Sequence, residues 1–291
     1  MVHPKGDMAT TSAAKGDLKA GREPATDQEQ KALLKKRADR RSRWIWRLAG
    51  YVFFIGVWQF SSTYLVEDFI LPPPLTILER MQEIVTSGLL VTHFGATLEK
   101  IAIGFSLAFI IGAFIGILMG MNRWWEAFFS DWVLILMTTP GLIFVLVSTM
   151  VFGLSYIGPI VAVVITGFPY VAVNLVEGVK AAPKDLTDMA RSYNVSRARL
   201  IRHVIIPFLA PFIFTAIRYG FSIAWKVATL TEVIGGNEGI GFMMRREFQT
   251  FSMAGFLSWA LLFFAFALFL ERVVLQRQID RFFRWRPEVT S

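Results

Sequence analysis

The chain has 291 residues, of which 54% are hydrophobic and 18% are charged, and 27 of them are Phe. This composition is too apolar for an ordinary soluble domain of this length and indicates a membrane protein. The net charge of +8 would suit a nucleic-acid-binding protein, but the cations cluster beside apolar segments, where they orient a chain in a bilayer, so nucleic acid is not an expected partner. The absence of Cys excludes disulfides, thiolate metal sites and Cys nucleophiles.

The N-terminal segment, residues 1–43, has no apolar run and is expected to be a largely disordered tail. It ends in a basic run, Lys31 to Arg43, directly before the first apolar segment. This position favours an anchor at the anionic lipid surface over a nucleic-acid site, so we expect a cytoplasmic N-terminus. No small-residue cleavage site follows a short apolar region, so a cleaved secretory signal is not expected.

Apolar stretches long enough to cross a hydrocarbon core of roughly 30 Å recur along the chain. They predict about six transmembrane helices, at about 47–66, 101–121, 128–152, 158–176, 208–234 and 251–270. An amphipathic helix is expected on the outer surface at 75–90, outer loops at 153–157 and 235–241, and cytoplasmic segments at 177–203 and at the Arg-rich C-terminus. The sequence therefore predicts an all-α polytopic membrane protein with both termini inside, a membrane domain over 44–286 and a tail over 287–291.

The second predicted span has a small residue at every fourth position: Gly104, Ala108, Gly112, Gly116 and Gly120. Such a stripe allows the backbone of another helix to approach closely. We interpret it as a packing face rather than a binding site.

The third predicted span contains Thr138, Thr139, Pro140 and Gly141 near its middle. Pro removes a backbone donor and Gly loosens the helix, so a break is expected here. Within a membrane, a break is tolerated only against protein or a water-filled cavity. A plain kink and a break that lines a substrate pathway both remain open at Thr139 and Pro140.

The fifth predicted span carries three charged residues, Arg218, Lys226 and Glu232. A charge at the bilayer centre costs about 2.5–3.5 kcal/mol, so these side chains should face protein or water, and they are candidates for a translocation pathway. Arg218, near the inner boundary, could instead snorkel or form a structural pair. Lys226 and Glu232 lie six residues apart, roughly 240° around the helix, so each needs another partner. Lys226 could line a path for an anion or form a salt bridge, and both readings remain open.

The polar segment 183–207 predicts two short helices at the inner surface. Pro183 suits a first helical position, Ser196 suits a cap for a second helix over 197–205, and this helix is expected to stop before Pro207. The first helix has one apolar stripe, formed by Leu186, Met189, Ala190 and Tyr193, and Asn194 can end it in the left-handed conformation. The pair of helices could lie on the membrane or dock on a soluble partner.

This segment resembles the cytoplasmic motif of binding-protein-dependent ABC importer permeases: Glu-Ala-Ala, three residues, Gly, nine residues, Ile, one residue, Leu-Pro. The spacing fits throughout, and five positions differ in residue type: Asp188 for Glu, Met189 for Ala, Asn194 for Gly, Val204 for Ile and Ile206 for Leu, followed by the matching Pro207. Asn is the residue best able to replace Gly in the left-handed region, and Asp keeps an acid at the helix start.

The resemblance extends over about 96–241 and is closest to permeases of the nitrate, sulfonate and taurine type. It includes Gly104-Phe105, Pro140, Phe152-Gly153, Ala224-Trp225-Lys226, Glu232 and Gly239-Ile240-Gly241. It implies a type I ABC importer permease fold in a bacterial inner membrane and a small anionic substrate such as a sulfonate, taurine or nitrate. The implied partners are a second copy of the chain, two copies of a cytoplasmic ABC ATPase and an external, periplasmic substrate-binding protein, with 183–207 coupling the ATPase to the spans.

Catalytic motifs do not occur in the sequence. It has no G-x-x-x-x-G-K-[ST] loop, no H-E-x-x-H and no G-x-S-x-G, so an enzyme, a cofactor and a metal are not expected, and ATP hydrolysis belongs to a separate subunit. The alternative function is a stand-alone secondary transporter or channel. That class would favour paired broken helices in inverted halves and more intramembrane acids.

Overall fold

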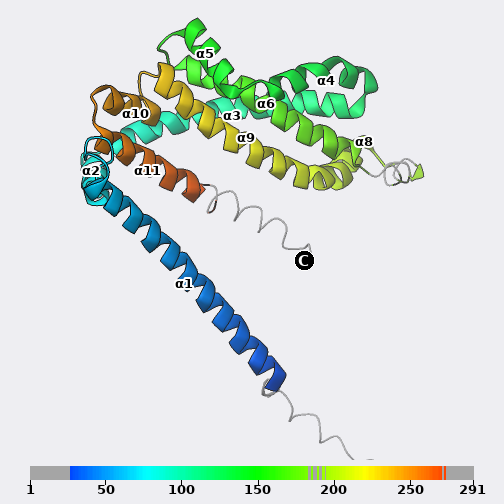
Figure 1. Cartoon of the computed structure of the whole chain (residues 1–291). Coiled ribbons are helices and arrows are strands. Elements are labelled where there is room, and N and C mark those ends of the chain that lie inside the picture. The colour runs from blue at the N-terminus through cyan, green and yellow to red at the C-terminus, as the bar shows by residue number, and fades with distance from the viewer. Residues whose placement is uncertain are drawn as a thin grey trace, which may run out of the picture. The chain divides into compact units, whose positions relative to one another are not determined.

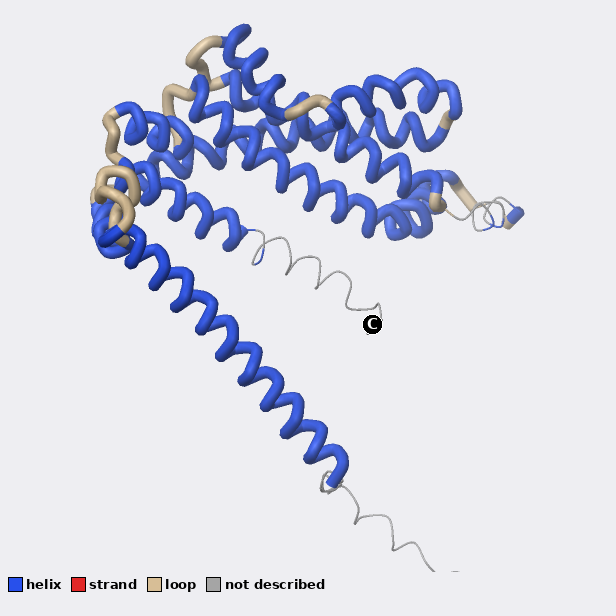
Figure 2. The backbone as a smooth tube through the Cα atoms, in the orientation of Figure 1, coloured by secondary structure: helices blue, strands red, loops and turns tan. Residues whose placement is uncertain are grey.

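All regular elements in the described part of the chain are helices. The computed structural model describes residues 27–182, 185, 189, 192, 193, 195–270 and 272, and it assigns no strand among them (Figures 1 and 2). The expectation of an all-α fold is confirmed.

The first helix, α1 (Asp27–Tyr64), is 38 residues long. It begins within the segment for which no regular structure was expected, so the basic run lies on a helix that continues into the first apolar segment. The chain divides into two compact units, Met1–Trp58 and Gln59–Ser291. The remaining description concerns the second unit.

Three long helices form the centre of the second unit: α3 (Leu89–Met121), α6 (Ile157–Lys180) and α9 (Ile206–Gly235). α3 packs along α6, and α6 packs along α9. The glycine stripe of α3 faces α6 so closely that a Cβ added at Gly112 or Gly116 would lie 2.5 Å from the backbone carbonyl oxygen of Phe168 or Ala172. The interpretation of the stripe as a packing face is therefore confirmed.

The expected break in the third span is present. α4 (Arg123–Thr138) and α5 (Gly141–Phe152) are separated by two residues, and their axes differ by 93°. Asn122 caps α4, because its side chain accepts a hydrogen bond from the backbone N–H of Trp124. The bend is far larger than a proline kink within a continuous helix, so the two helices form a broken span or a re-entrant loop.

A smaller cluster joins α2 (Pro74–Thr86), α10 (Ile240–Gln249) and α11 (Met253–Phe269). Its core contains Ile84, Ile240, Met243, Trp259 and Phe263. An ion pair from Arg80 of α2 to Glu247 of α10, 3.4 Å long, lies at its edge. A hydrogen bond from Arg80 to Glu83, 2.7 Å long, is the main cause that raises the pKa of the Arg80 guanidinium. The sequence did not predict α10, which begins inside the Gly-rich segment.

The number of spans differs from the sequence-based count of six. Within the described residues, three helices are long and apolar enough to cross a membrane, or four if α4 and α5 count as one span. α11 is apolar but has 17 residues. In α1, the polar residues Gln59, Ser61, Ser62 and Thr63 dilute the apolar stretch. Membrane crossing by α1 and by α11, the two further spans of the six-span prediction, therefore remains a prediction.

The second helix of the polar segment does not stop before Pro207, so this part of the prediction was wrong. α8 (Arg197–Leu200) continues into a π-helical turn (Ile201–Ile205), which leads directly into α9. Pro207 lies in the first turn of α9, directly after the π-helical turn, and because it has no N–H it cannot donate a hydrogen bond to that turn.

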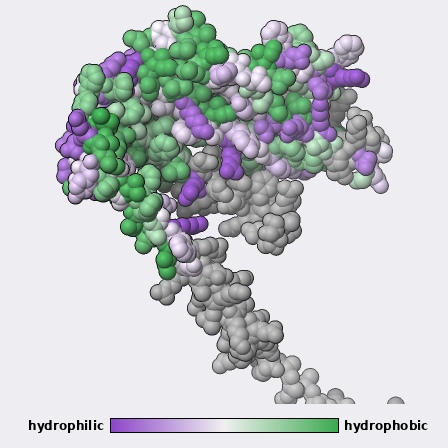
Figure 3. Space-filling model, viewed as in Figure 1, coloured by the Kyte–Doolittle hydropathy of each residue, from purple (hydrophilic) through white to green (hydrophobic). Residues whose placement is uncertain are grey.

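Large apolar side chains cover much of the surface of the second unit (Figure 3). They are dense on α4 and α5, where Trp124, Trp132, Leu142, Val147 and Met150 are exposed. Apolar patches of this extent on a soluble monomer would be unusual. They indicate surfaces that contact lipid or another chain.

Candidate functional site

One face of α9 is exposed and polar. Arg218, Tyr219 and Lys226 are exposed on it, and Ser222 is half-buried. Tyr219, Ser222 and Lys226 are separated by three and four residues, so they lie on one side of the helix. The structure thus places two of the sequence-predicted pathway residues, Arg218 and Lys226, on an open part of the helix surface.

Lys226 lies beside the aromatic ring of Trp225, with its Nζ 5.5 Å from the ring centroid. Trp225 in turn packs on Phe263, with ring centroids 5.1 Å apart. The electron-rich ring face attracts the ammonium group without neutralising it. The Lys226 side chain therefore presents a positive charge on the exposed face of α9.

The break between α4 and α5 packs beside this part of α9. A Cβ added at Gly141 would be 3.9 Å from Cγ2 of Val227, the residue after Lys226. The Thr139 hydroxyl donates a 2.7 Å hydrogen bond to the backbone carbonyl of Ile135, and Pro140 is exposed. The break that contains Thr139 and Pro140 therefore packs on α9 next to Val227, whereas Lys226 lies on the exposed side of the same helix turn.

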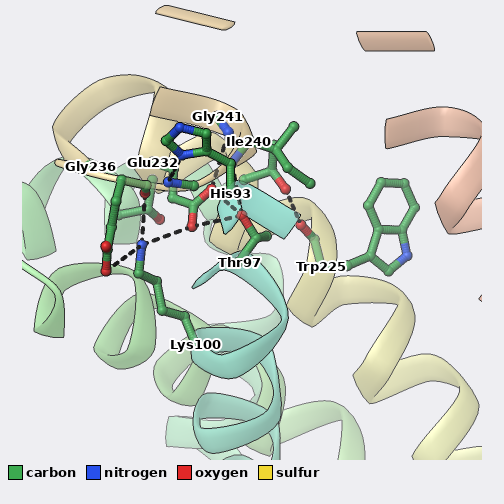
Figure 4. A network of polar contacts seen from close by, with 12 residues as sticks. His93, Thr97, Lys100, Trp225, Glu232, Gly236, Ile240 and Gly241 are labelled. Carbon is green, nitrogen blue, oxygen red and sulfur yellow. Dashed lines mark hydrogen bonds and ion pairs between the residues drawn. The ribbon is translucent and has the colours of Figure 1, made fainter. Parts of the chain in front are cut away.

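Glu232 lies on another side of α9 and is fully buried. Its carboxylate accepts hydrogen bonds from Lys100 Nζ at 3.1 Å, from the Thr97 hydroxyl at 2.9 Å and from the Gly241 backbone N–H at 3.1 Å (Figure 4). The 240° separation expected from the sequence agrees with this arrangement, because Lys226 faces outward while Glu232 faces α3. The structure does not place Glu232 with the other candidate pathway residues.

Lys100 is a buried charged residue that the sequence analysis did not single out. It is fully buried on α3, and its Nζ also donates a 2.8 Å hydrogen bond to the backbone carbonyl of Glu238. In sequence, it stands just before a long apolar run and is easily read as a flanking charge. The signal that could have identified it is Glu232, an intramembrane acid that needs a cationic partner.

Part of the predicted coupling segment lies outside the described residues, including Leu186, Asp188, Ala190 and Asn194. Met189 and Tyr193 are exposed, at 57% and 77% of their maximal accessible area. The backbone N–H of Tyr193 donates a 3.1 Å hydrogen bond to the carbonyl of Met189, as in a helical turn. Two large members of the predicted stripe are therefore accessible in this chain.

Comparison with known proteins places these features in a family context. The family described as "binding-protein-dependent transport system inner membrane component" matches residues 87–285. The bicarbonate transport system permease protein CmpB of Synechococcus elongatus is 31% identical over 249 residues, covering 80% of this chain and 88% of that protein. The taurine transport system permease protein TauC of Escherichia coli is 27% identical over 268 residues, covering 86% of this chain and 96% of that protein.

A solved structure has the same fold. The MetNI methionine ABC transporter in an inward-facing conformation aligns with a TM-score of 0.57 and 16% identity, covering 67% of this chain and 95% of the compared chain. The family resemblance and the fold expected from the sequence are therefore both confirmed.

Proposed function

The chain belongs to the family of binding-protein-dependent transport system inner membrane components, and on this basis we propose that it forms the translocation pathway for a small anion in an ABC importer. It is a multi-pass permease subunit rather than an enzyme. In our proposal two copies associate with two cytoplasmic ABC ATPase subunits and receive substrate from an external binding protein. Both termini are cytoplasmic. Family membership favours this function over a stand-alone secondary transporter or channel.

The exposed face of α9 carries the proposal. Lys226 and Tyr219 lie on it, and Gly141, the residue after the break, packs against Val227, the residue after Lys226. A broken helix can supply backbone groups to a water-filled path, which lipid would not tolerate. A cation on this face attracts an anion and repels cations. Arg218, two turns closer to the start of α9, extends the positive charge along the path.

The relatives support the anionic substrate class. CmpB is named for bicarbonate, which is a small anion, and TauC for taurine, which contains a sulfonate group. A single lysine offers charge but little shape discrimination. We therefore assign the choice among small anions to the external binding protein and their passage to the Lys226 face.

Uptake by the assembled importer tests the pathway. Lys226→Ala should lower anion uptake about tenfold, which corresponds to the loss of about 1.4 kcal/mol of interaction, and Lys226→Arg should lower it less. Arg123→Ala is the matched control, because Arg123 is an exposed cation at the start of α4. If Lys226→Ala instead releases the ATPase subunits or the second copy, Lys226 is a structural residue and the pathway assignment fails.

The segment 183–207 is the proposed contact with the ATPase. Met189 and Tyr193 are exposed, and water contact with large apolar side chains costs on the order of 1 kcal/mol or more each, which a groove on a partner would remove. Ala190→Glu and Leu186→Asp should abolish stimulation of ATP hydrolysis by the binding protein while expression stays normal. Unchanged stimulation and unchanged ATPase pull-down in both variants would leave this segment as a membrane-surface helix.

A further inference from the structure

Side chains from α3 and α10 donate hydrogen bonds to backbone carbonyls in and beside the loop between α9 and α10. Lys100 donates a 2.8 Å hydrogen bond to the Glu238 carbonyl, and the Arg245 guanidinium donates 3.0 Å and 2.5 Å hydrogen bonds to the carbonyls of Ile234 and Gly236. The backbone N–H groups of the loop are also engaged. Gly239 N–H donates to His93 Nδ1 at 3.3 Å, and the next N–H donates to the Thr97 hydroxyl at 2.9 Å.

The loop is folded directly onto the buried carboxylate of Glu232. Gly239 adopts a φ of 111°, a backbone conformation that residues with a side chain rarely adopt. A Cβ added there would also collide with this carboxylate. Gly241 donates its N–H to the same group. Glu232, Thr97 and Lys100 therefore form one network that ties α3, the end of α9 and the start of α10 together (Figure 4).

A second turn reaches the same lysine. Tyr156, in the turn between α5 and α6, places its ring centroid 5.7 Å from Lys100 Nζ. A fully buried ion pair is weak evidence for stability, because the desolvation of both charges offsets their attraction. Its better-attested use is to fix the register of the elements it joins. Lys100 stands where α3 and two interhelical turns meet, which suits that use.

We propose that Lys100 is a positioning residue that fixes the α9–α10 loop and the adjoining end of α9 to α3, so that these elements move as one unit during transport. Lys226 lies six residues before Glu232 on α9, so the network also sets the position of the Lys226 face. The link to transport rests on the proposed function. The fixing of the loop does not.

Distance measurements test the fixing of the loop directly. The chain has no native Cys, so spin labels can be attached at Gly95→Cys on α3 and Asn237→Cys at the exposed loop tip. A side chain at position 95 meets open space. In vesicles, the full chain should give one narrow label-to-label distance distribution. Lys100→Met should broaden it, and Thr97→Val, a milder change in the same network, should broaden it less.

The control variant is Arg80→Met, which removes an ion pair to α10 that lies outside the network. It should leave the distribution narrow. Unchanged distributions for both Lys100→Met and Thr97→Val would overturn the proposal that Lys100 fixes the loop. The proposal would also be overturned if Arg80→Met broadened the distance distribution as much as Lys100→Met does, because the broadening would then reflect a general loosening of the fold.

Uptake by the assembled importer, carrying the same variants, tests the consequence for transport. Thr97→Val should lower uptake at least threefold while the ATPase subunits stay bound. A broadened distance distribution with normal uptake would overturn the role in transport and leave the proposed function standing. If the wild-type chain supports no uptake in the complex, the proposed function fails, and the distance measurement still decides the role of Lys100 in the fold.

Discussion

The contact between α3 and α6 allows a quantitative test of the packing. A Cβ added at Gly116 would lie 2.5 Å from the Ala172 carbonyl oxygen, whereas ordinary contacts begin at 3.4 Å, so the helices must separate by about 0.9 Å. The opposing atom belongs to a helix backbone and cannot rotate away. Overpacking of this kind costs about 1–3 kcal/mol, and the better helix propensity of Ala returns about 0.5–1 kcal/mol. Subtracting the midpoints of these two ranges, we expect Gly116→Ala to destabilise the chain by about 1 kcal/mol.

The assay is heat denaturation of the purified chain in mild detergent. For a domain of this size, the expected loss corresponds to a fall in Tm of about 2–4 °C. Gly95→Ala, on the same helix, is the matched control, because no atom lies within 4 Å of the added Cβ. It should leave the Tm unchanged or slightly raised. Equal Tm values for the two variants would refute the close packing of α3 on α6.

Two further predictions concern the ion pairs and the topology. Lys100→Met leaves a buried carboxylate without its cation and should lower the free energy of unfolding by about 3–5 kcal/mol. Arg80→Met breaks a partly exposed ion pair and should lower it by less than about 1 kcal/mol. Similar falls in Tm for the two variants would contradict this difference. A thiol placed by Asn237→Cys should react with an impermeant reagent in intact cells, whereas thiols placed by Thr10→Cys or Ser291→Cys should not. The opposite labelling would overturn the predicted orientation.

The packing face of α3 and the break between α4 and α5 were predictable because each follows from a local sequence pattern. Regular spacing of small residues marked the face of α3 that packs on α6, and Pro140 with Gly141 marked the break. The end of α3 at Met121 agrees with the predicted end of the second span. These features depend on residues within a few turns of one another.

The features that were missed depend on residues far apart in the sequence. Lys100 and Glu232 are separated by 132 positions, so only the fold shows that the lysine is buried. α10 was obscured by glycines, because Gly239 and Gly241 signal a loop although the second of them lies within a helix. The π-helical turn at 201–205 has no sequence signature apart from Pro207, which was read as a stop. Long-range pairing and tertiary packing decide these positions.

Purification of the complex tests the assignment as an importer permease most directly. The tagged chain should be isolated in mild detergent from the membranes of the cell that makes it, reconstituted in vesicles and assayed for ATP hydrolysis with and without the external binding protein. An ATP-hydrolysing subunit should co-purify with the chain, and the loaded binding protein should stimulate its ATP hydrolysis. Anion uptake by the chain alone, driven by an ion gradient without ATP or a second subunit, would contradict the assignment.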